Sequence, residues 1–374
     1  MTHECNLCSE PFQKPVYEPL GTRRESKVLV CENCGLCQSI QSNDPESGKR
    51  TLSSDAGWGN VRHAKGVRLE AQKENLIRTL KNLPPKAIVL DLGSSRGQFI
   101  KWCKSVFPDF QFVGIEPDQS IAETFEFEKH RIYVDKFEDI QNLGDQKFDF
   151  IFCNHTLEHV DNAVQAIEFM KRYLKADGIL WLDVPNLEGI NDLQVVEEFF
   201  IDKHMYHFEL NTVKNLLHHC NFEIRNSFGD DLNIVLTATP TKTTKPVLLN
   251  SKITRLDILK YQERLLRNRA VLPGIVEKLQ MTPNVAIYGA GRILDALIRY
   301  GGLKTVNITV ADKFLWETAS GLGIAIQNPE KVDWRSYDEI FILGRSSTEE
   351  IREWLSNNGA RKITAFQDLW NSTI

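Results

Sequence analysis

Apolar and polar positions between residues 87 and 240 follow two alternating patterns. Short apolar runs typical of buried strands occur at residues 87–91, 110–116, 131–134, 148–153 and 179–184. Apolar positions at helical spacing predict helices at residues 97–107, 120–129, 163–174 and 212–219. Residues 222–226 and 233–239 then predict a closing antiparallel hairpin. This succession predicts an α/β fold with a parallel, doubly wound sheet.

Two further regions flank this one. Before it, residues 68–83 show helical spacing and predict a covering helix that ends at Pro84 and Pro85. After it, residues 239–246 form a Pro/Thr-rich linker, and residues 256–279 predict a long charged helix. Strands are then predicted at residues 285–288, 306–310 and 339–343, with helices ending at Tyr300 and spanning 348–358. The chain therefore ends in a second, smaller α/β unit.

Composition and charge narrow the class of protein. The 374 residues are 42% hydrophobic and 25% charged, which indicates an ordinary globular protein of two or three domains. The net charge of −5 supplies no field that would attract a nucleic acid backbone, so we expect no nucleic acid partner. No apolar run reaches the ~20 residues of a membrane span, and the N-terminus shows no signal-peptide pattern. We therefore expect a cytoplasmic protein; the sequence does not indicate its oligomeric state.

Four cysteines near the N-terminus have the spacing of a metal site. Cys5 and Cys8 form one C-x-x-C pair, Cys31 and Cys34 form another, and 22 residues separate the two pairs. Two such pairs supply four sulfurs for a structural Zn²⁺ ion, which lets a short module fold without a large core. Reduced thiols without metal and a redox pair are the alternatives. Cys37 is a fifth thiol that could compete as a ligand but is expected to pack in the core.

The turn after the first core strand indicates the cofactor. Asp91 opens the turn, glycines at 93 and 97 allow a ligand to approach the backbone, and Glu116 ends the next strand, where it can bind a ribose. A dinucleotide site would have G-x-G-x-x-G, whereas the acid in this turn suits the cationic sulfonium and ammonium of S-adenosylmethionine. A doubly wound domain with another ligand is the alternative. The predicted cofactor-binding residues are Asp91, Gly93, Ser95, Gly97, Gln98, Glu116, Pro117 and Asn154.

These features resemble the class I methyltransferases, whose first motif is an E/D-x-G-x-G-x-G turn followed by a ribose-binding acid. Ser95 stands at the position of the middle glycine. The whole chain also resembles the three-part sugar C-methyltransferases, which combine a zinc-binding domain, a methyltransferase core and a C-terminal Rossmann-like domain. The features that match are the cysteine pairs with Cys34-Gly-Leu, the core, and the C-terminal Tyr288-Gly-Ala-Gly.

The resemblance implies a domain division and a substrate. It places a zinc-binding module at residues 1–50, the methyltransferase core with its covering helix at 51–240, a linker and long helix at 241–283, and a Rossmann-like domain at 284–374. Members of this family act on nucleotide-linked sugars, often 4-keto sugars. The resemblance therefore implies a small-molecule acceptor such as a sugar nucleotide or a polysaccharide precursor.

The same resemblance points to two candidate bases. In the family, catalytic groups include a histidine after the fourth strand and a Tyr-x-Glu-His segment after the fifth. His159 matches the first position, and residues 201–204 align with the second but keep only its histidine, His204. Methyl transfer to oxygen or nitrogen, which needs only one base, therefore competes with transfer to a ring carbon. Packing or capping roles are the alternative for both histidines.

The C-terminal unit has a second glycine turn. Gly289-Ala-Gly291 follows a strand, and Asp312 stands where a nucleotide ribose acid would, but Leu294 replaces the third glycine. We therefore expect this unit to bind the nucleotide part of the substrate or to buttress the core. Two other classes stay open for the whole chain: a non-catalytic scaffold that keeps the fold, and a nicotinamide-dependent sugar oxidoreductase.

Overall fold

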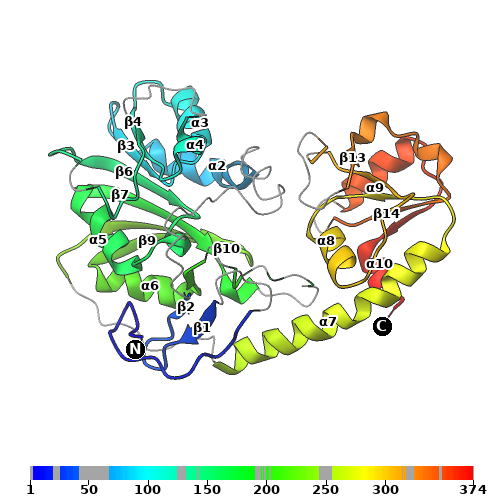
Figure 1. The fold of residues 1–374 in the computed structure, drawn as a ribbon. Coiled ribbons are helices and arrows are strands. Elements are labelled where there is room, and N and C mark those ends of the chain that lie inside the picture. Colours follow the sequence, from blue (N-terminus) through cyan, green and yellow to red (C-terminus); the bar gives the residue numbers. More distant parts are fainter. Residues whose placement is uncertain are drawn as a thin grey trace. The chain divides into compact units, whose positions relative to one another are not determined.

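The computed structural model describes residues 3–19, 26–41, 67–123, 132–140, 143–189, 195, 197, 199–201, 204–243, 255–313, 315–316, 324–344 and 348–373. The chain forms two compact units (Figure 1). Unit 1 comprises residues 1–52, 66–191 and 197–261, and unit 2 comprises residues 53–65, 192–196 and 262–374. Unit 1 runs across the expected boundary at residue 50, so the cysteine module and the core form one compact body. The four-part division stays a prediction about separable domains.

Unit 1 contains the predicted doubly wound sheet. Its seven strands lie in the order β5-β4-β3-β6-β7-β10-β9. The pairs from β5 to β7 are parallel, and the pairs of β10 with β7 and with β9 are antiparallel. The strands are β3 (Ile88–Leu92), β4 (Gln111–Ile115), β5 (Ile132–Tyr133), β6 (Phe148–Asn154), β7 (Leu174–Pro185), β9 (Phe222–Gly229) and β10 (Asn233–Pro240).

Helices and the cysteine module cover the two faces of this sheet. Strand residues alternate between two apolar clusters, with Val89 in one and Leu90 in the other. The first cluster contains residues of α2 and α3, and the second contains residues of α5, α6 and the cysteine module (Figure 1). The helices of unit 1 are α2 (Val67–Leu80), α3 (Gln98–Val106), α4 (Gln119–Ala122), α5 (Ala163–Tyr173) and α6 (Leu210–His219).

A small sheet joins the cysteine module to a distant segment. Its strands are β1 (Lys27–Val30), β2 (Cys37–Ile40) and β8 (Tyr206–His207), in the order β1-β2-β8 with antiparallel pairs. The Ser39 amide also donates to the Met205 carbonyl, at 2.8 Å. The module therefore holds the segment that follows His204, although almost 170 residues separate the paired strands.

Unit 2 is the second α/β unit that the sequence predicts. Its five parallel strands lie in the order β13-β12-β11-β14-β15. These are β11 (Val285–Tyr288), β12 (Thr309–Ala311), β13 (Ile326–Gln327), β14 (Glu339–Ile342) and β15 (Ile363–Ala365). The helices are α7 (Arg255–Met281), which begins in unit 1, α8 (Arg292–Arg299), α9 (Thr348–Asn357) and α10 (Phe366–Asn371).

Some element boundaries differ from the prediction. The strand expected at residues 306–310 begins only at Thr309, because Asn307 adopts a left-handed φ of 70° that a strand cannot contain. Strand β7 begins at Leu174, directly after α5, rather than at Ile179. Of the helix expected at residues 120–129, the part from 124 onward lies outside the described residues, as does the linker from 244.

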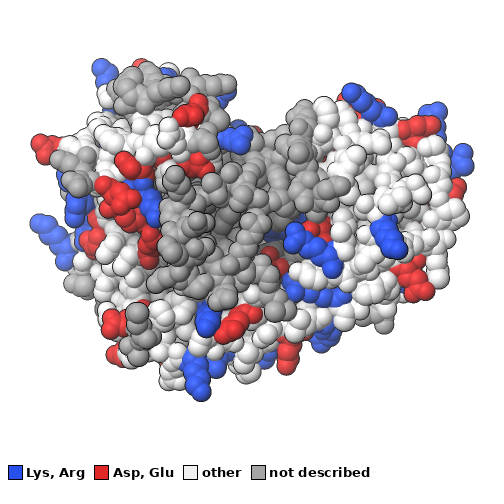
Figure 2. Space-filling view, in the orientation of Figure 1, with Lys and Arg blue, Asp and Glu red and all other residues white. Residues whose placement is uncertain are grey.

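The described residues show neither a membrane-spanning helix nor, on the face drawn in Figure 2, a large surface patch of one charge sign. Among the described residues, no helix is long and apolar enough to cross a membrane. Lysines and arginines are interspersed with acidic residues over the face drawn in Figure 2, and the described residues show no large patch of one sign there.

Candidate functional site

The glycine turn between β3 and α3 has a backbone that few residues tolerate. Gly93, Ser95 and Gly97 have φ values of 79°, 48° and 72°, all in the left-handed region. A Cβ atom on Gly93 would lie 2.1 Å from Thr156 Oγ1, so no larger residue fits there. Ser95, at the position of the middle glycine of the methyltransferase motif, adopts the glycine-like conformation itself.

Glu116 follows β4 and faces this turn. The Ser95 amide donates to its Oε2 at 2.8 Å, and the Asp118 amide donates to its Oε1 at 3.0 Å. The residue is buried, and these two bonds hold its carboxylate beside the turn. Because each carboxylate oxygen can accept more than one hydrogen bond, both still have capacity for the hydroxyls of a ribose.

Asp91 adds a second buried carboxylate. Burial raises the pKa of Asp91 well above its usual range, and the charge of Glu116 raises it further. Burial also raises the pKa of Glu116, against the two backbone hydrogen bonds that lower it. Two neighbouring buried carboxyls are costly to ionise unless a cation joins them, which suits a ligand with sulfonium and ammonium groups.

The remaining predicted cofactor residues lie at the same edge of the sheet. β3 pairs with both β4 and β6, and the three strands run parallel, so their carboxyl ends meet at the point where the chain reverses its direction of winding. Asn154 ends β6, and its buried Oδ1 has no hydrogen-bond partner among the described residues. Gln98 is the first residue of α3, and Pro117 is exposed beside Glu116. The orphaned amide oxygen and the glycine turn therefore fit a cofactor at this edge.

A second group of polar side chains follows β6. The 3-10 helix η3 (Leu157–His159) places Glu158 in the interior, at 1% exposure. Its Oε1 lies 3.2 Å from His155 Nδ1 and 3.8 Å from His159 Nε2. Burial opposes the ionisation of Glu158, but the adjacent imidazoles of His159 and His155 lower its pKa overall, below the usual range. The two histidines therefore favour the ionised form of this carboxylate.

His204 meets this group from a distant part of the chain. Its ring centroid lies 5.0 Å from that of His159, so the structure brings the two predicted base candidates together. His204 Nδ1 lies 2.9 Å from the Phe199 carbonyl oxygen, which can only accept, so Nδ1 carries a proton and donates it. Burial, followed by the charge of His159, lowers the pKa of His204 to about 3.

Several residues of the site did not follow from the sequence. His155 has a left-handed φ of 49°, and its Nε2 lies 3.0 Å from Asn233 Oδ1 on β10. Asp183, on β7, accepts the His155 amide through its carbonyl oxygen at 2.8 Å. His207 lies 2.7 Å from Ser39 Oγ of the cysteine module. Only Glu158 had a visible signal, since it directly precedes a candidate histidine, whereas the other contacts join separate strands.

The two cysteine pairs have matching backbone turns. The Ser9 amide donates to the Cys5 carbonyl at 2.9 Å, and the Gly35 amide donates to the Cys31 carbonyl at 2.8 Å. Ser9 and Gly35 both have positive φ values, 61° and 76°. This repetition explains why each pair turns its two sulfurs to the same side.

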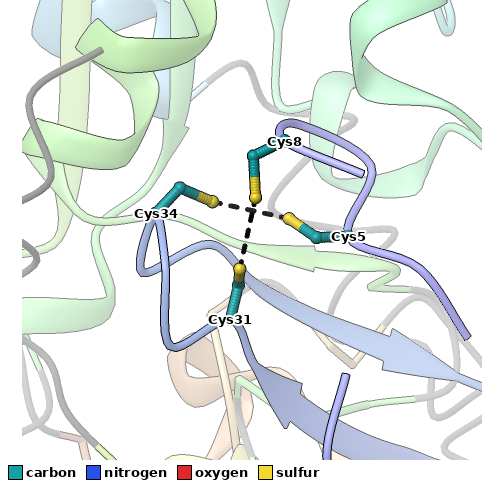
Figure 3. Close-up of side chains that lie close together, drawn as sticks. All are labelled: Cys5, Cys8, Cys31 and Cys34. Carbon is teal, nitrogen blue, oxygen red and sulfur yellow. Dashed lines mark hydrogen bonds between the residues drawn. The ribbon is translucent and has the colours of Figure 1, made fainter. Parts of the chain in front are cut away.

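The four sulfurs converge on one point (Figure 3). Cys5 and Cys34 are 3.4 Å apart at Sγ, as are Cys8 and Cys31, and all four sulfurs lie within 4.8 Å of one another. Tetrahedral zinc at the usual Zn–S distance separates its sulfurs by about 3.8 Å, so the donor set fits this ion. Hydrogen bonding with the Cys31 sulfur and burial raise the pKa of Cys5 to about 12, which a bound cation would reverse. Cys37 is buried and does not belong to this group.

Unit 2 repeats the arrangement of acid and glycine turn. Gly289 has a φ of 109°, and the Ala290 amide donates to Asp312 Oδ2 at 3.0 Å. The Leu315 amide donates to Asp312 Oδ1 at the same distance. Asp312 is thus held by two amides, as Glu116 is in unit 1. Leu294, at the position of a third glycine, is fully buried in the core of unit 2.

Comparison with known families identifies the core. Residues 63–227, which contain the glycine turn, Glu116 and both candidate histidines, match a methyltransferase domain family. The chain contains a class I, S-adenosylmethionine-dependent methyltransferase domain. The expected cofactor class and the expected fold class are confirmed at this level. The sugar C-methyltransferase group and its substrates are not established by the match.

Individual relatives are distant. The chain is 25% identical over 172 residues to a tRNA U34 carboxymethyltransferase of Campylobacter hominis, and 31% identical over 102 residues to an uncharacterised protein of Methanocaldococcus jannaschii. These alignments cover 45% and 27% of this chain, and 59% and 46% of the relatives. The chain thus spans about half the length of the curated relatives it matches.

The solved structures that match are more distant in sequence than these relatives. The plantazolicin methyltransferase BpumL, in complex with a triazolic desmethylPZN analogue and SAH, has 13% identity and a TM-score of 0.42, covering 52% of this chain and 94% of its own. A Pyrococcus horikoshii protein, PH0226, has 14% identity and a TM-score of 0.41, covering 54% of this chain and 100% of its own.

Proposed function

We propose that this protein transfers the methyl group of S-adenosylmethionine to an activated sugar, in particular a nucleotide-linked sugar or a polysaccharide precursor. The observation that carries the proposal is that a pair of carboxylates and a Glu-His pair lie at the carboxyl ends of three neighbouring strands, β3, β4 and β6. Asp91 lies near the end of β3 and Glu116 follows β4, where they fit the methyl donor. Glu158 and His159 follow the adjacent β6. A donor and a proton-accepting group therefore lie at one edge of the sheet.

His204 or His159 takes the proton from the acceptor in this proposal. Since His204 Nδ1 donates to the Phe199 carbonyl, its Nε2 is the nitrogen that can accept a proton. The chain lacks the tyrosine and glutamate of the family segment at residues 201–204. A hydroxyl or amine acceptor, which requires removal of only one proton, fits this reduced set as well as a ring carbon does.

The other parts of the chain have supporting roles. Cys5, Cys8, Cys31 and Cys34 hold a structural Zn²⁺ ion, supported by the convergence of their sulfurs. Asp312 and the glycine turn of unit 2 bind the nucleotide portion of the substrate, supported by their likeness to the turn at Glu116. A reducing cytoplasm, where the thiols stay available to the metal, is the compartment that suits such a protein.

A nucleic acid acceptor is the second candidate, since one relative is named as a tRNA-modifying enzyme. The net charge of −5 and the mixed charges of the visible face favour a small acceptor over a polyanion. A scaffold without activity is opposed by the retained Asp91, Gly93, Gly97 and Glu116.

The deciding experiment is incubation of the purified chain with isotopically labelled S-adenosylmethionine and a panel of nucleotide sugars, with bulk tRNA as a separate arm. Mass spectrometry of the products should show label on a sugar of the panel, and fragmentation should locate it on carbon, oxygen or nitrogen. Labelling of tRNA alone would overturn the sugar assignment. Binding of S-adenosylmethionine without labelling of any acceptor would favour the scaffold.

A further inference from the structure

Glu158, His159 and His204 present three metal-binding side chains to one point. One ligand atom of each lies within 4.8 Å of the ligand atoms of the other two. The group shares no residue with the four-cysteine site. Two imidazoles and one carboxylate are the donor set of known zinc sites that keep an open coordination position.

One buried oxygen of Glu158 has no hydrogen-bond partner among the described residues, and proton transfer by a histidine does not explain this. This oxygen is Oε2, and the side chain that carries it is almost completely buried. Its other oxygen already faces His155 and His159. A buried carboxylate oxygen without a hydrogen-bond donor is costly, and coordination of a cation by both oxygens of Glu158 would offset that cost.

His204 has the tautomer that coordination requires. Metal-binding histidines usually donate their second ring nitrogen to a backbone carbonyl or carboxylate, which fixes the ring and leaves the other nitrogen deprotonated. His204 Nδ1 makes this contact with the Phe199 carbonyl at 2.9 Å, so Nε2 is the available ligand.

The fold also holds the two halves of the group together. The Met205 amide, next to His204, donates to the Glu158 carbonyl at 2.7 Å. The Ser39 amide of the cysteine module donates to the Met205 carbonyl at 2.8 Å. Ligands that lie 46 residues apart in sequence are therefore fixed by backbone hydrogen bonds, as a preformed site requires.

From these contacts we infer that Glu158, His159 and His204 bind a divalent transition-metal ion of the Zn²⁺ or Co²⁺ type, separate from the ion of the cysteine site. Two nitrogen ligands favour such an ion over Mg²⁺ or Ca²⁺, which prefer oxygen. With three protein ligands, a fourth position is open to water or to an acceptor oxygen.

This inference goes beyond the proposed function and does not depend on it. A coordinated imidazole nitrogen cannot accept a proton, so direct proton removal by His159 or His204 belongs to the metal-free protein. In the metal-bound protein, the ion would lower the pKa of an oxygen bound at its open position. The two histidines have a role in both states, as proton acceptors in the metal-free protein and as ligands in the metal-bound protein. Glu158 acts as a ligand only in the metal-bound protein.

Cobalt binding to the full-length protein tests the site without any assay of activity. The protein is prepared with zinc in the cysteine site and titrated with Co²⁺, followed by calorimetry and visible absorption. We expect one additional Co²⁺ per chain, with d–d bands but without the intense thiolate charge-transfer bands of a cysteine site. Glu158→Gln, His159→Gln and His204→Gln should each weaken this binding more than about 100-fold, beyond the 10–100-fold typical of an outer-shell partner.

The matched control is His219→Gln, which changes an exposed histidine at the end of α6 outside the group. It should bind Co²⁺ as the unchanged protein does. Thermal unfolding checks that the variants are folded, and His159→Gln, at a side chain 27% exposed, gives the least disruptive of the three changes. Absence of a second ion, thiolate bands alone, or a folded His159→Gln protein that binds Co²⁺ with unchanged affinity would overturn the inference.

Discussion

Glu116 shows how a single buried side chain can be oriented before its ligand arrives. Two backbone amides, of Ser95 and Asp118, hold its two oxygens, and the raised pKa reflects its burial. Asp91 is buried in the same acidic site, where the charge of Glu116 adds to the effect of burial on its pKa. At this scale, the arrangement suits a cationic cofactor that also carries a ribose.

Replacing Glu116 should weaken S-adenosylmethionine binding without unfolding the protein. Glu116→Gln should cost roughly 1.5–3 kcal/mol of binding free energy, the scale of hydrogen bonds to a charged group. Calorimetry measures the change, and Glu123→Gln, at an exposed position on the following turn, is the control. Equal affinity of the Glu116 variant and the control would contradict the placement of the cofactor.

Cofactor binding should also release protons. In the free protein the raised pKa values of Asp91 and Glu116 favour their protonated forms, whereas a cationic ligand favours the ionised forms. Affinity for S-adenosylmethionine should therefore increase with pH until the pH exceeds the raised pKa values, and then level off. Calorimetry at one pH in buffers of different ionisation enthalpy measures the release, which Asp91→Asn should reduce. A binding enthalpy independent of the buffer would refute this coupling.

The paired histidines predict a split between turnover and cofactor affinity. His204→Ala should lower kcat by about 10²–10⁴-fold, the contribution of a positioned proton acceptor, and leave the Kd for S-adenosylmethionine within a small factor. His159→Ala is the comparison, and His219→Ala is the control. A larger loss from His159→Ala would assign the base to that residue, and unchanged turnover in both variants would remove the pair from the reaction.

At the scale of elements, the cysteine module packs against the methyltransferase core and pairs with one of its segments. Strand β2 lies between β1 and β8, so the module supports the segment that carries His204. Its buried residues Leu29 and Leu36 belong to the same apolar cluster as strand residues of the core. A metal ion that holds the two cysteine pairs together would therefore also stabilise the segment next to His204.

Loss of one cysteine should consequently affect both stability and activity. Cys31→Ser should lower Tm by about 5 °C or more, at roughly 2–4 °C per kcal/mol, and should lower the zinc content by one ion per chain. Turnover should decrease in parallel because β8 loses its neighbour. Cys37→Ala, a buried cysteine outside the cluster, is the matched control and should retain the zinc. A Cys31→Ser protein with unchanged zinc content and Tm would contradict the structural site.

At the scale of the whole molecule, the two units carry similar acid-and-glycine turns for different tasks. Glu116 and Asp312 are each held by two backbone amides beside a glycine turn. The methyltransferase domain match, residues 63–227, lies almost entirely in unit 1. The proposal assigns the turn of unit 2 to the nucleotide of the substrate, so each unit binds one ligand.

The two ligands should therefore be separable by mutation. Asp312→Asn should weaken binding of a nucleoside diphosphate by about 10–100-fold, the effect of losing one or two charge-assisted hydrogen bonds, and should leave S-adenosylmethionine affinity unchanged. Glu116→Gln should do the reverse. Calorimetry of the full-length chain measures both ligands. If Asp312→Asn binds the diphosphate as tightly as the unchanged protein, unit 2 has another role.

The sequence by itself determined what depends on short-range spacing. Strand and helix periods predicted both sheets, because burial of one face repeats every two or 3.6 residues whatever the partner is. The cysteine pairs and the turn from Asp91 to Gly97 were visible for the same reason, since each is built within a few residues. Only the tertiary structure decided which distant groups meet: β8 with the cysteine module, and His204 with Glu158 and His159. Those contacts depend on packing and on backbone hydrogen bonds between segments far apart in the chain, and no local pattern records them.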